Sequence, residues 1–186
     1  MPFTPTKLPG VMIFEPKVFG DSRGYFFESY NAAVFKEAGI DAVFVQDNES
    51  KSSYGVLRGM HLQREPQGQA KLVRVSRGAI YDVVADITPG SPTLGQWVGV
   101  ELSGDNRRQL FVPRGYAHGF VTLSEEAYLL YKCDNLYAPD FEDGVRYDDP
   151  TLNISWPVPA TSILVSRKDA VWPLLTDVAG HTPLLR

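Results

Sequence analysis

Residues 56–75 read VLRGMHLQREPQGQAKLVRV, and this stretch combines β-strand character with several chemically useful side chains. Successive side chains of a strand point to opposite faces. A strand here would place His61 and Gln63 on one face, with Met60 and Leu62 on the other. The stretch is therefore expected to present a histidine from a sheet.

A second alternating segment follows at once. Residues Lys71–Ser76 would group Lys71 with Val73 and Val75 on one face. A lysine beside two valines is expected either at a sheet edge or pointing into a cavity. One candidate base, His61, and two cations, Arg58 and Lys71, near a barrel interior would suit chemistry on an anionic substrate. A solvated hairpin with a hydrogen-bonded histidine explains the stretch equally well.

Short apolar segments separated by turn residues continue through the chain. The separators R-G, T-P-G-S-P, S-G-D-N, P-R-G-Y and S-E-E all favour tight turns. We expect strands at Val11–Phe14, Tyr25–Tyr30, Val43–Asn48, Met60–Gln63, Lys71–Ser76, Ala79–Ile87, Gln96–Leu102, Gln109–Val112, His118–Leu123 and Ala127–Cys133. Many short strands with few helices predict an all-β sandwich or barrel, and a jelly roll could enclose a small ligand between its sheets.

Two short peripheral helices are expected beside these strands. Asn31 can cap a helix at Ala32–Ala38 that Gly39 ends, and a second helix is predicted at Arg167–Leu175. No repeat, low-complexity segment or linker divides the chain. We therefore predict a single domain over residues 1–186.

Composition excludes several classes of partner. Hydrophobic residues make up 44% and charged residues 22% of the 186 residues, and the formal net charge is −4. This balance argues against nucleic-acid binding, which needs a dense basic patch. No segment has the roughly 18 apolar residues of a membrane span, and no signal-like run precedes Gly10. With Cys133 as the single cysteine, a cytoplasmic protein is expected.

Metal and nucleophile chemistry have weak support. The central motif is H-x-Q rather than H-x-H, and His61 and His118 alone make a poor metal site, since His181 lies near the C-terminus. Cys133 ends an apolar strand and is expected to be inert core. G-x-S-x-G and glycine-rich phosphate motifs are missing from the sequence. We expect neither a metal nor an organic cofactor.

Proton transfer is the remaining chemistry. The ordinary pKa of histidine, about 6.5, suits His61 to general-base catalysis. A carboxylate usually fixes the tautomer of such a base. Lys71 or His118 could stabilise an enolate formed beside a carbonyl. Spacing leaves four candidates for the carboxylate: Asp47, Asp82, Asp86 and Asp169.

Two further groups of side chains have alternative interpretations. Tyr131 could protonate the opposite side of a flat enolate, or it could be a core tyrosine with one hydrogen bond. Gln46 and Asn48 share a strand face with Phe44, and they could bind a nucleobase or hydrogen-bond a neighbouring loop.

The chain closely resembles the dTDP-4-dehydrorhamnose 3,5-epimerase family. The matching segments run in order from about residue 10 to 175: FGDSRGYFFESY, FVQDNESKS, GVLRGMHLQ, QAKLVRVSRGAIYDVVADI, GQWVGVELS, PRGYAHGFVTLSE, YLLYKCDNLYAP and SRKDAVWPLL. The resemblance implies a cupin-type jelly roll that epimerises both carbons beside the C4 ketone of dTDP-4-dehydro-6-deoxyglucose, without metal or organic cofactor.

The resemblance also implies roles for particular residues. His61 in R-G-x-H corresponds to the base, Asp169 in S-x-K-D to its orienting partner and Tyr131 in L-Y-K to the proton donor. Lys71 and His118 correspond to residues that line the sugar and stabilise the enolate. The substrate-binding positions are Arg23, Glu28, Gln46, Asp47, Asn48, Arg58, Glu142 and Lys168. A homodimer is implied, with the segment from Arg23 to Glu28 crossing to the partner's site.

Three positions depart from the family pattern. Met60 stands where leucine is usual, Tyr116 where phenylalanine is common, and Tyr147 where tryptophan is usual. All three roughly preserve size and apolar character, so they bear on substrate fit more than on chemistry. A single-position epimerase or ketoisomerase, a silent sugar-binding cupin and a metal-dependent cupin remain alternatives.

Overall fold

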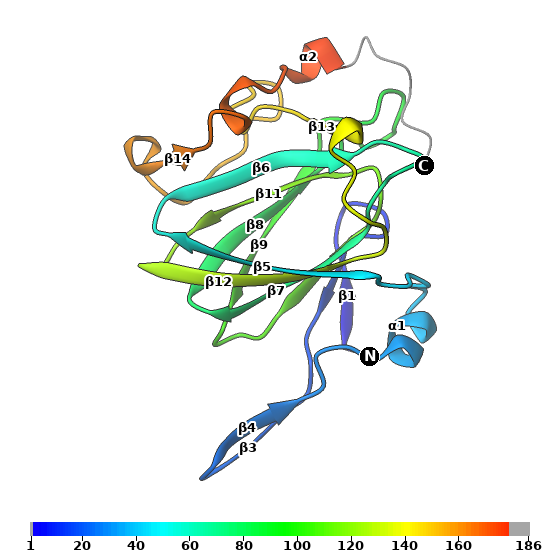
Figure 1. Cartoon of the computed structure of the whole chain (residues 1–186), viewed down its shortest axis with the longest axis vertical. Helices are drawn as coiled ribbons and strands as arrows, with labels where there is room; N and C mark the ends of the chain where they lie inside the picture. The colour runs from blue at the N-terminus through cyan, green and yellow to red at the C-terminus, as the bar shows by residue number, and fades with distance from the viewer. Residues whose placement is uncertain (1, 179–186) are drawn as a thin grey trace.

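The computed structural model describes residues 2–178, which form two six-stranded sheets and a separate hairpin (Figure 1). The first sheet, in the order β1-β2-β10-β7-β12-β5, contains β1 (Phe3–Pro5), β2 (Met12–Phe14), β5 (Gln46–Ser53), β7 (Lys71–Arg77), β10 (Gln109–Val112) and β12 (Glu126–Cys133). The second, in the order β13-β6-β11-β8-β9 with β14 beside β6, contains β6 (Val56–Gln63), β8 (Ala79–Ala85), β9 (Trp97–Ser103), β11 (Ala117–Thr122), β13 (Glu142–Gly144) and β14 (Leu164–Val165). The predicted all-β jelly roll is confirmed.

The main hydrophobic core lies between the two sheets. Val73 and Leu129 of the first sheet share one buried cluster with Ile80 and Phe120 of the second. Burying a side chain of this size contributes roughly 1.5–3 kcal/mol. The core therefore joins the sheets and fixes which side chains face inward.

The second sheet is buried on its outer face as well. Val83 and Ala85 of β8 point away from the main core and pack with Leu152 and Leu175 of the segment that follows β13. That segment runs over the second sheet and ends in α2 (Leu175–Val178) (Figure 1). Burial on both faces explains why β8 has an almost continuous apolar sequence.

Two predicted strands have different bounds in the structure. The strand expected at Val43–Asn48 is β5, which begins at Gln46 and continues to Ser53. Its partner β12 ends at Cys133, which lies opposite Gln46, so the ladder has no partner for Val43. The strand expected at Tyr25–Tyr30 is β4 (Gly24–Phe27), whose partner β3 (Val18–Asp21) ends the pairing at Phe27.

The helix predictions differ in outcome. Helix α1 (Ala32–Glu37) is confirmed, and the Asn31 side chain accepts a hydrogen bond from the Ala33 N–H as an N-cap. The helix predicted at Arg167–Leu175 is wrong, because only a 3-10 turn, η3 (Asp169–Val171), forms there. Pro173 disfavours helical dihedrals at the residue before it. Two further 3-10 turns are η1 (Pro139–Phe141) and η2 (Ala160–Ser162).

The hairpin of β3 and β4 projects away from the two sheets (Figure 1). Its aromatic residues are exposed: 54% of Phe19, 58% of Tyr25 and 68% of Phe26. An isolated two-stranded hairpin is marginally stable in water, and grouped exposed apolar residues mark interaction surfaces. The hairpin is therefore a surface to which a partner can bind.

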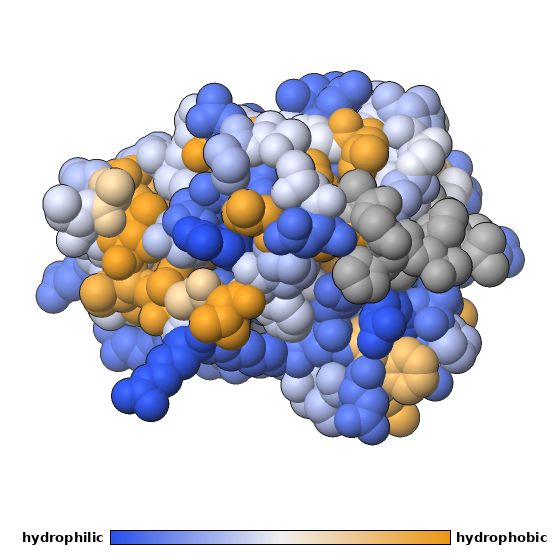
Figure 2. Space-filling view, turned by 90° about the horizontal axis from the view of Figure 1, so that it is seen from above, coloured by the Kyte–Doolittle hydropathy of each residue, from blue (hydrophilic) through white to orange (hydrophobic). Residues whose placement is uncertain are grey.

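The face seen from above carries a mixture of hydrophilic and apolar residues (Figure 2). The apolar residues gather on the side where β14 lies in Figure 1. Among residues 2–178, no helix has the length and apolar character needed to cross a membrane.

Candidate active site

A cavity of about 350 Å³ opens between the two sheets, and we call it the central cavity. It is lined by Gln46, Asn48, His61, Leu62, Gln63, Gln69, Lys71, Tyr131, Tyr137 and Glu142. Both sheets contribute to it, with His61 on β6 and Tyr131 on β12. Side chains that are distant in sequence therefore meet around one small volume.

The predicted alternation of β6 is confirmed. His61 and Gln63 line the central cavity. Met60 and Leu62 are 0% and 4% exposed and belong to the cluster on the outer face of the second sheet. The histidine is therefore presented inward.

His61 is partly buried and lies near several positive groups. Burial lowers the pKa of His61 to about 3, and Lys71, His118 and Lys168 add to this effect. The imidazole is accordingly neutral near pH 7 and has a free lone pair. A substrate with negative charge would offset the three positive groups and strengthen this base.

Lys71 points into the central cavity, which confirms the cavity interpretation over the sheet-edge one. It is 9% exposed and lies on β7, an interior strand between β10 and β12. Burial lowers the pKa of Lys71, while Cys133, Asp82 and Glu142 oppose this shift. A buried amine at this position can donate a hydrogen bond to an oxygen atom that gains negative charge.

Tyr131 faces the same cavity from the other sheet. It is partly buried, and burial raises the pKa of the Tyr131 phenol. The phenol therefore keeps its proton near neutral pH. His61 and Tyr131 thus line one cavity from opposite sheets, the first with a neutral imidazole and the second with a protonated phenol.

His118 lies behind the cavity rather than in its lining. Its Nε2 is 2.6 Å from Asp82 Oδ1, and both residues are buried on the inner face of the second sheet. The other carboxylate oxygen, Asp82 Oδ2, has no hydrogen-bond partner among residues 2–178. His118 is therefore held in place by Asp82, and it lies opposite His61 on the neighbouring strand.

The four candidate carboxylates for His61 have different neighbours. Asp82 binds His118, Asp86 accepts hydrogen bonds from the Ser91 and Thr93 hydroxyls, and Asp47 pairs with Lys132. Each of these three carboxylates is thus hydrogen-bonded or paired with a group other than His61. Asp169 is 6% exposed and lines a second cavity together with His61, although no hydrogen bond joins their side chains within the described residues.

This second cavity has a volume of about 430 Å³ and lies between β6 and the segment at residues 164–169. It is lined by Val56, Leu57, Arg58, His61, Leu164, Val165, Ser166, Lys168 and Asp169. His61 borders both cavities. The Lys168 ammonium donates a hydrogen bond to Glu142, which lines the central cavity, so the two cavities are linked.

Not every predicted binding residue reaches these cavities within one chain. Arg23 lies in the projecting hairpin and pairs with Asp21 at 2.6 Å. Glu28 accepts a hydrogen bond from Asn31. Asp47 does not line the central cavity, because alternation along β5 points its side chain away from that of Gln46; it lines a separate surface cavity of about 340 Å³, which Asn48 also borders.

The amides of the first sheet contact a loop, as one of the two sequence interpretations predicted. Gln46 Oε1 accepts a hydrogen bond from the Tyr137 N–H, and Gln46 Nε2 donates one to Asn48 Oδ1. Both amides also line the central cavity. The loop contact is therefore confirmed for Gln46, whereas Asn48 contacts Gln46 and the Cys133 sulfur of β12.

Three polar lining residues were not predicted as site residues from the sequence: Gln63, Gln69 and Tyr137. For Gln63 the signal was its shared face with His61. Tyr137 lies in an irregular loop, where periodicity gives no information. Within the described residues, no three His, Cys, Asp or Glu side chains come together as a set of metal ligands, and His181 lies outside those residues.

A jelly roll that encloses a neutral histidine, a buried lysine and a protonated tyrosine has the machinery of a cupin-type proton-transfer protein. The family model for dTDP-4-dehydrorhamnose 3,5-epimerase matches residues 5–177. The chain belongs to this family.

Relatives match over nearly the full chain. The dTDP-4-dehydrorhamnose 3,5-epimerase of Salmonella typhimurium is 54% identical over 171 residues, which cover 91% of this chain and 93% of that protein. A Legionella pneumophila epimerase, solved in complex with dTDP-4-keto-L-rhamnose, is 48% identical and superposes with a TM-score of 0.89 over 94% of this chain and 92% of that one.

A 3'-monoepimerase from Streptomyces bikiniensis, solved with dTDP-quinovose, is similar as well. It is 35% identical, with a TM-score of 0.87 over 92% of this chain and 87% of that one. The same architecture thus occurs in an enzyme whose name specifies one carbon instead of two.

Proposed function

We propose that this chain is an isomerase that converts dTDP-4-dehydro-6-deoxy-D-glucose to dTDP-4-dehydro-L-rhamnose. It inverts C3 and C5, the two carbons beside the C4 ketone. The observation that carries the proposal is that His61 and Tyr131 face one cavity from opposite sheets. Inverting a carbon requires a proton to leave one side of the ring and a proton to arrive on the other.

Each inversion proceeds through proton transfers alone. The neutral His61 imidazole accepts the proton from the carbon beside the ketone, and the electron pair of the broken C–H bond moves into an enolate. Lys71 donates a hydrogen bond to the enolate oxygen and stabilises its charge. Tyr131 then donates its proton to the opposite face of the same carbon. Solvent exchange returns both residues to their starting states, and because no electrons are gained or lost, no redox cofactor is needed.

Asp169 is the carboxylate best placed to orient the base. It is buried and lines the second cavity beside His61. A carboxylate near a catalytic imidazole fixes its tautomer and stabilises its protonated form. Its role in positioning His61 is therefore part of the proposal.

Polar and charged side chains of the two cavities are proposed to bind the nucleotide part of the substrate. Arg58 and Lys168 supply two cations in the second cavity for the diphosphate. Gln46, Asn48 and Glu142 supply polar groups in the central cavity. His118 lies behind the cavity and is hydrogen-bonded to Asp82, and its proposed role is to stabilise the negative charge of the enolate on the sugar.

We further propose that the protein is a homodimer in which the β3–β4 hairpin completes the partner's site. The hairpin exposes Phe19 and Phe26, which a partner could cover. The hairpin also carries Arg23, and Glu28 follows directly after it, so in a dimer both residues would reach the partner's site. A cytoplasmic location remains an expectation, based on the single, buried Cys133.

Subunit complementation tests this shared site. Arg23→Ala and His61→Asn are each expected to be inactive as homodimers. After mixing and exchange, the heterodimer holds one site with both His61 and Arg23, so activity should return. Mixtures that stay inactive although native mass spectrometry shows the heterodimer would refute the sharing.

Deuterium incorporation tests the reaction itself. Turnover of the substrate in D₂O, followed by NMR, should place deuterium at both C3 and C5. Label at one carbon only would instead assign a single-position epimerase. His61→Asn should lower turnover by about 10² to 10⁴-fold, whereas a sugar-binding protein without catalysis would show no turnover to lose.

A further inference from the structure

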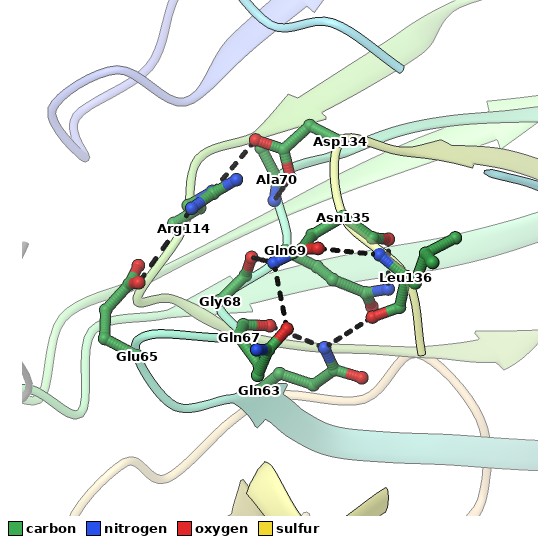
Figure 3. A network of polar contacts seen from close by, with 10 residues as sticks. All are labelled: Gln63, Glu65, Gln67, Gly68, Gln69, Ala70, Arg114, Asp134, Asn135 and Leu136. Atoms are coloured by element: carbon green, nitrogen blue, oxygen red, sulfur yellow. Dashed lines mark hydrogen bonds and ion pairs between the residues drawn. The ribbon is translucent and has the colours of Figure 1, made fainter. Parts of the chain in front are cut away.

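The loop at residues 134–138, between β12 and η1, forms one wall of the central cavity. Its residue Tyr137 lines the cavity, while the Tyr137 side chain and backbone together remain 56% exposed. A loop in such an exposed position needs fixed contacts to hold one conformation. Hydrogen bonds from β6 and from the turn at residues 64–70 supply many of them (Figure 3).

Gln63 makes the central contacts to this loop (Figure 3). Its Nε2 donates to the Leu136 carbonyl at 3.2 Å and to the Gln67 carbonyl at 2.6 Å, and its Oε1 accepts from the Ala138 N–H at 2.8 Å. Gln63 thus binds the backbone on both sides of Tyr137. The residue is 5% exposed, so water cannot readily replace these bonds.

The contact also ties the loop to the proposed base. Gln63 lies two residues after His61 on the same face of β6, so one rigid strand carries both side chains. The Tyr137 hydroxyl in turn donates to Glu142 Oε2 at 3.1 Å, and Glu142 accepts from Lys168. A continuous set of contacts therefore leads from β6 through Tyr137 to the wall shared by the two cavities.

Other contacts hold the first residues of the loop (Figure 3). Gln69 donates to the Asn135 carbonyl at 2.7 Å, and Asp134 accepts from the Ala70 N–H and from Arg114. These bonds fix the start of the loop. The backbone beside Tyr137 is held by Gln63, and the Tyr137 N–H also donates to Gln46 Oε1, while the Tyr137 hydroxyl is held by Glu142.

We propose that Gln63 is a positioning residue, which holds Tyr137 at a fixed place over the cavity and so sets affinity for the nucleotide sugar. This inference rests on the proposed function, since it names the substrate that the wall binds. Gln63 acts through Tyr137 and takes no part in proton transfer. Its loss should therefore raise KM and leave kcat nearly unchanged.

Gln63→Met tests the proposal, because it keeps the length of the side chain and removes every hydrogen bond. We expect KM for the dTDP-sugar and Kd for dTDP, measured by calorimetry, to rise roughly tenfold, as for a loss of about 1.4 kcal/mol, with kcat within about threefold of wild type. Gln67→Met is the matched control: its side chain makes a 3.4 Å contact with Asn135 and its backbone carbonyl is kept. It should behave as wild type.

A double-mutant cycle with Tyr137→Ala gives the sharper readout. If Gln63 acts through Tyr137, adding Gln63→Met to Tyr137→Ala should change KM by less than about twofold, because the coupled effect is already lost. Independent, multiplying effects would overturn the proposal. So would a fall in kcat with KM unchanged.

Gln63→Glu keeps the inference testable if the methionine variant does not fold. Its carboxylate still accepts from Ala138 but repels the carbonyls of Leu136 and Gln67. Relative to wild type, its KM should be raised at neutral pH and should recover as pH falls, since the protonated form regains a donor. If the KM of Gln63→Glu divided by the KM of wild type does not vary with pH, the proposal is wrong. Turnover by the wild type tests the proposed function separately, so the two failures are distinguishable.

Discussion

Arg58 and His61 lie on the same side of β6, although residues three positions apart in a regular strand face opposite sides. Both line the second cavity. On the neighbouring β11, His118 is opposite His61 and Phe120 is opposite Arg58, so β6 has one residue more than β11 between these pairs. This extra residue is a β-bulge, which reverses the alternation locally. The bulge therefore places Arg58, which we propose binds the diphosphate, beside the proposed base His61.

Gly59 makes the bulge sterically possible, and its replacement should be costly. It has φ of +118°, and a Cβ at this position would lie 2.6 Å from Gly119 Cα and from the His118 carbonyl oxygen. We expect Gly59→Ala to lower the free energy of unfolding by about 3 kcal/mol or more, from strain and backbone overlap. Urea denaturation measures the change.

Gly90→Ala is the control for strain alone. Gly90 has φ of +79°, and a Cβ there would meet nothing within 4 Å. It should cost about 1–2 kcal/mol and leave KM unchanged. Equal losses in the two variants would show that the close approach of β6 and β11 does not matter.

The sequence predicted those features of the site that follow from strand alternation. His61 and Gln63 were placed on one face, and Lys71 beside Val73, and both arrangements occur. The bulge next to Arg58 could not be predicted, because it depends on the register with β11.

Contacts between distant segments were beyond local reasoning as well. The pairing of Asp82 with His118, and the contact of Gln63 with Leu136, join residues 36 and 73 positions apart. Asp47 is a different case, since its exposure on the far side of β5 follows from alternation with Gln46.

Lys71 is expected to lower the free energy of unfolding while it increases turnover. A buried cation is costly to keep, and burial lowers the pKa of Lys71 for that reason. Lys71→Met removes the charge and keeps the apolar stem, so the free energy of unfolding should rise by about 1–3 kcal/mol. Turnover should fall about 10² to 10³-fold, because the enolate loses its donor. A variant that is both less stable and fully active would contradict both roles.

Stability should depend on pH through His61. Burial lowers the pKa of His61 to about 3, below the value near 6.5 of an unfolded chain. Between these values the unfolded chain binds more protons, so this contribution to stability is complete above pH 6.5 and is lost as pH falls toward 3. Between pH 7.5 and pH 5, wild type should lose about 1–2 kcal/mol more than His61→Asn, which does not titrate. Parallel urea titrations of the two proteins give this difference, and parallel pH profiles would contradict it.

Tyr131→Phe separates the two halves of the proposed reaction. Phenylalanine fills nearly the same space, but it has no proton to donate to the second face of the ring. His61 remains neutral and can still remove the proton and return one to the same face. In D₂O the variant should therefore incorporate deuterium into the unchanged substrate, while inversion falls by about 10² to 10⁴-fold. NMR of the recovered sugar shows exchange and configuration together. Loss of exchange along with inversion would mean that Tyr131 takes part in removing the proton, and inversion at the wild-type rate would mean that another group donates to the second face.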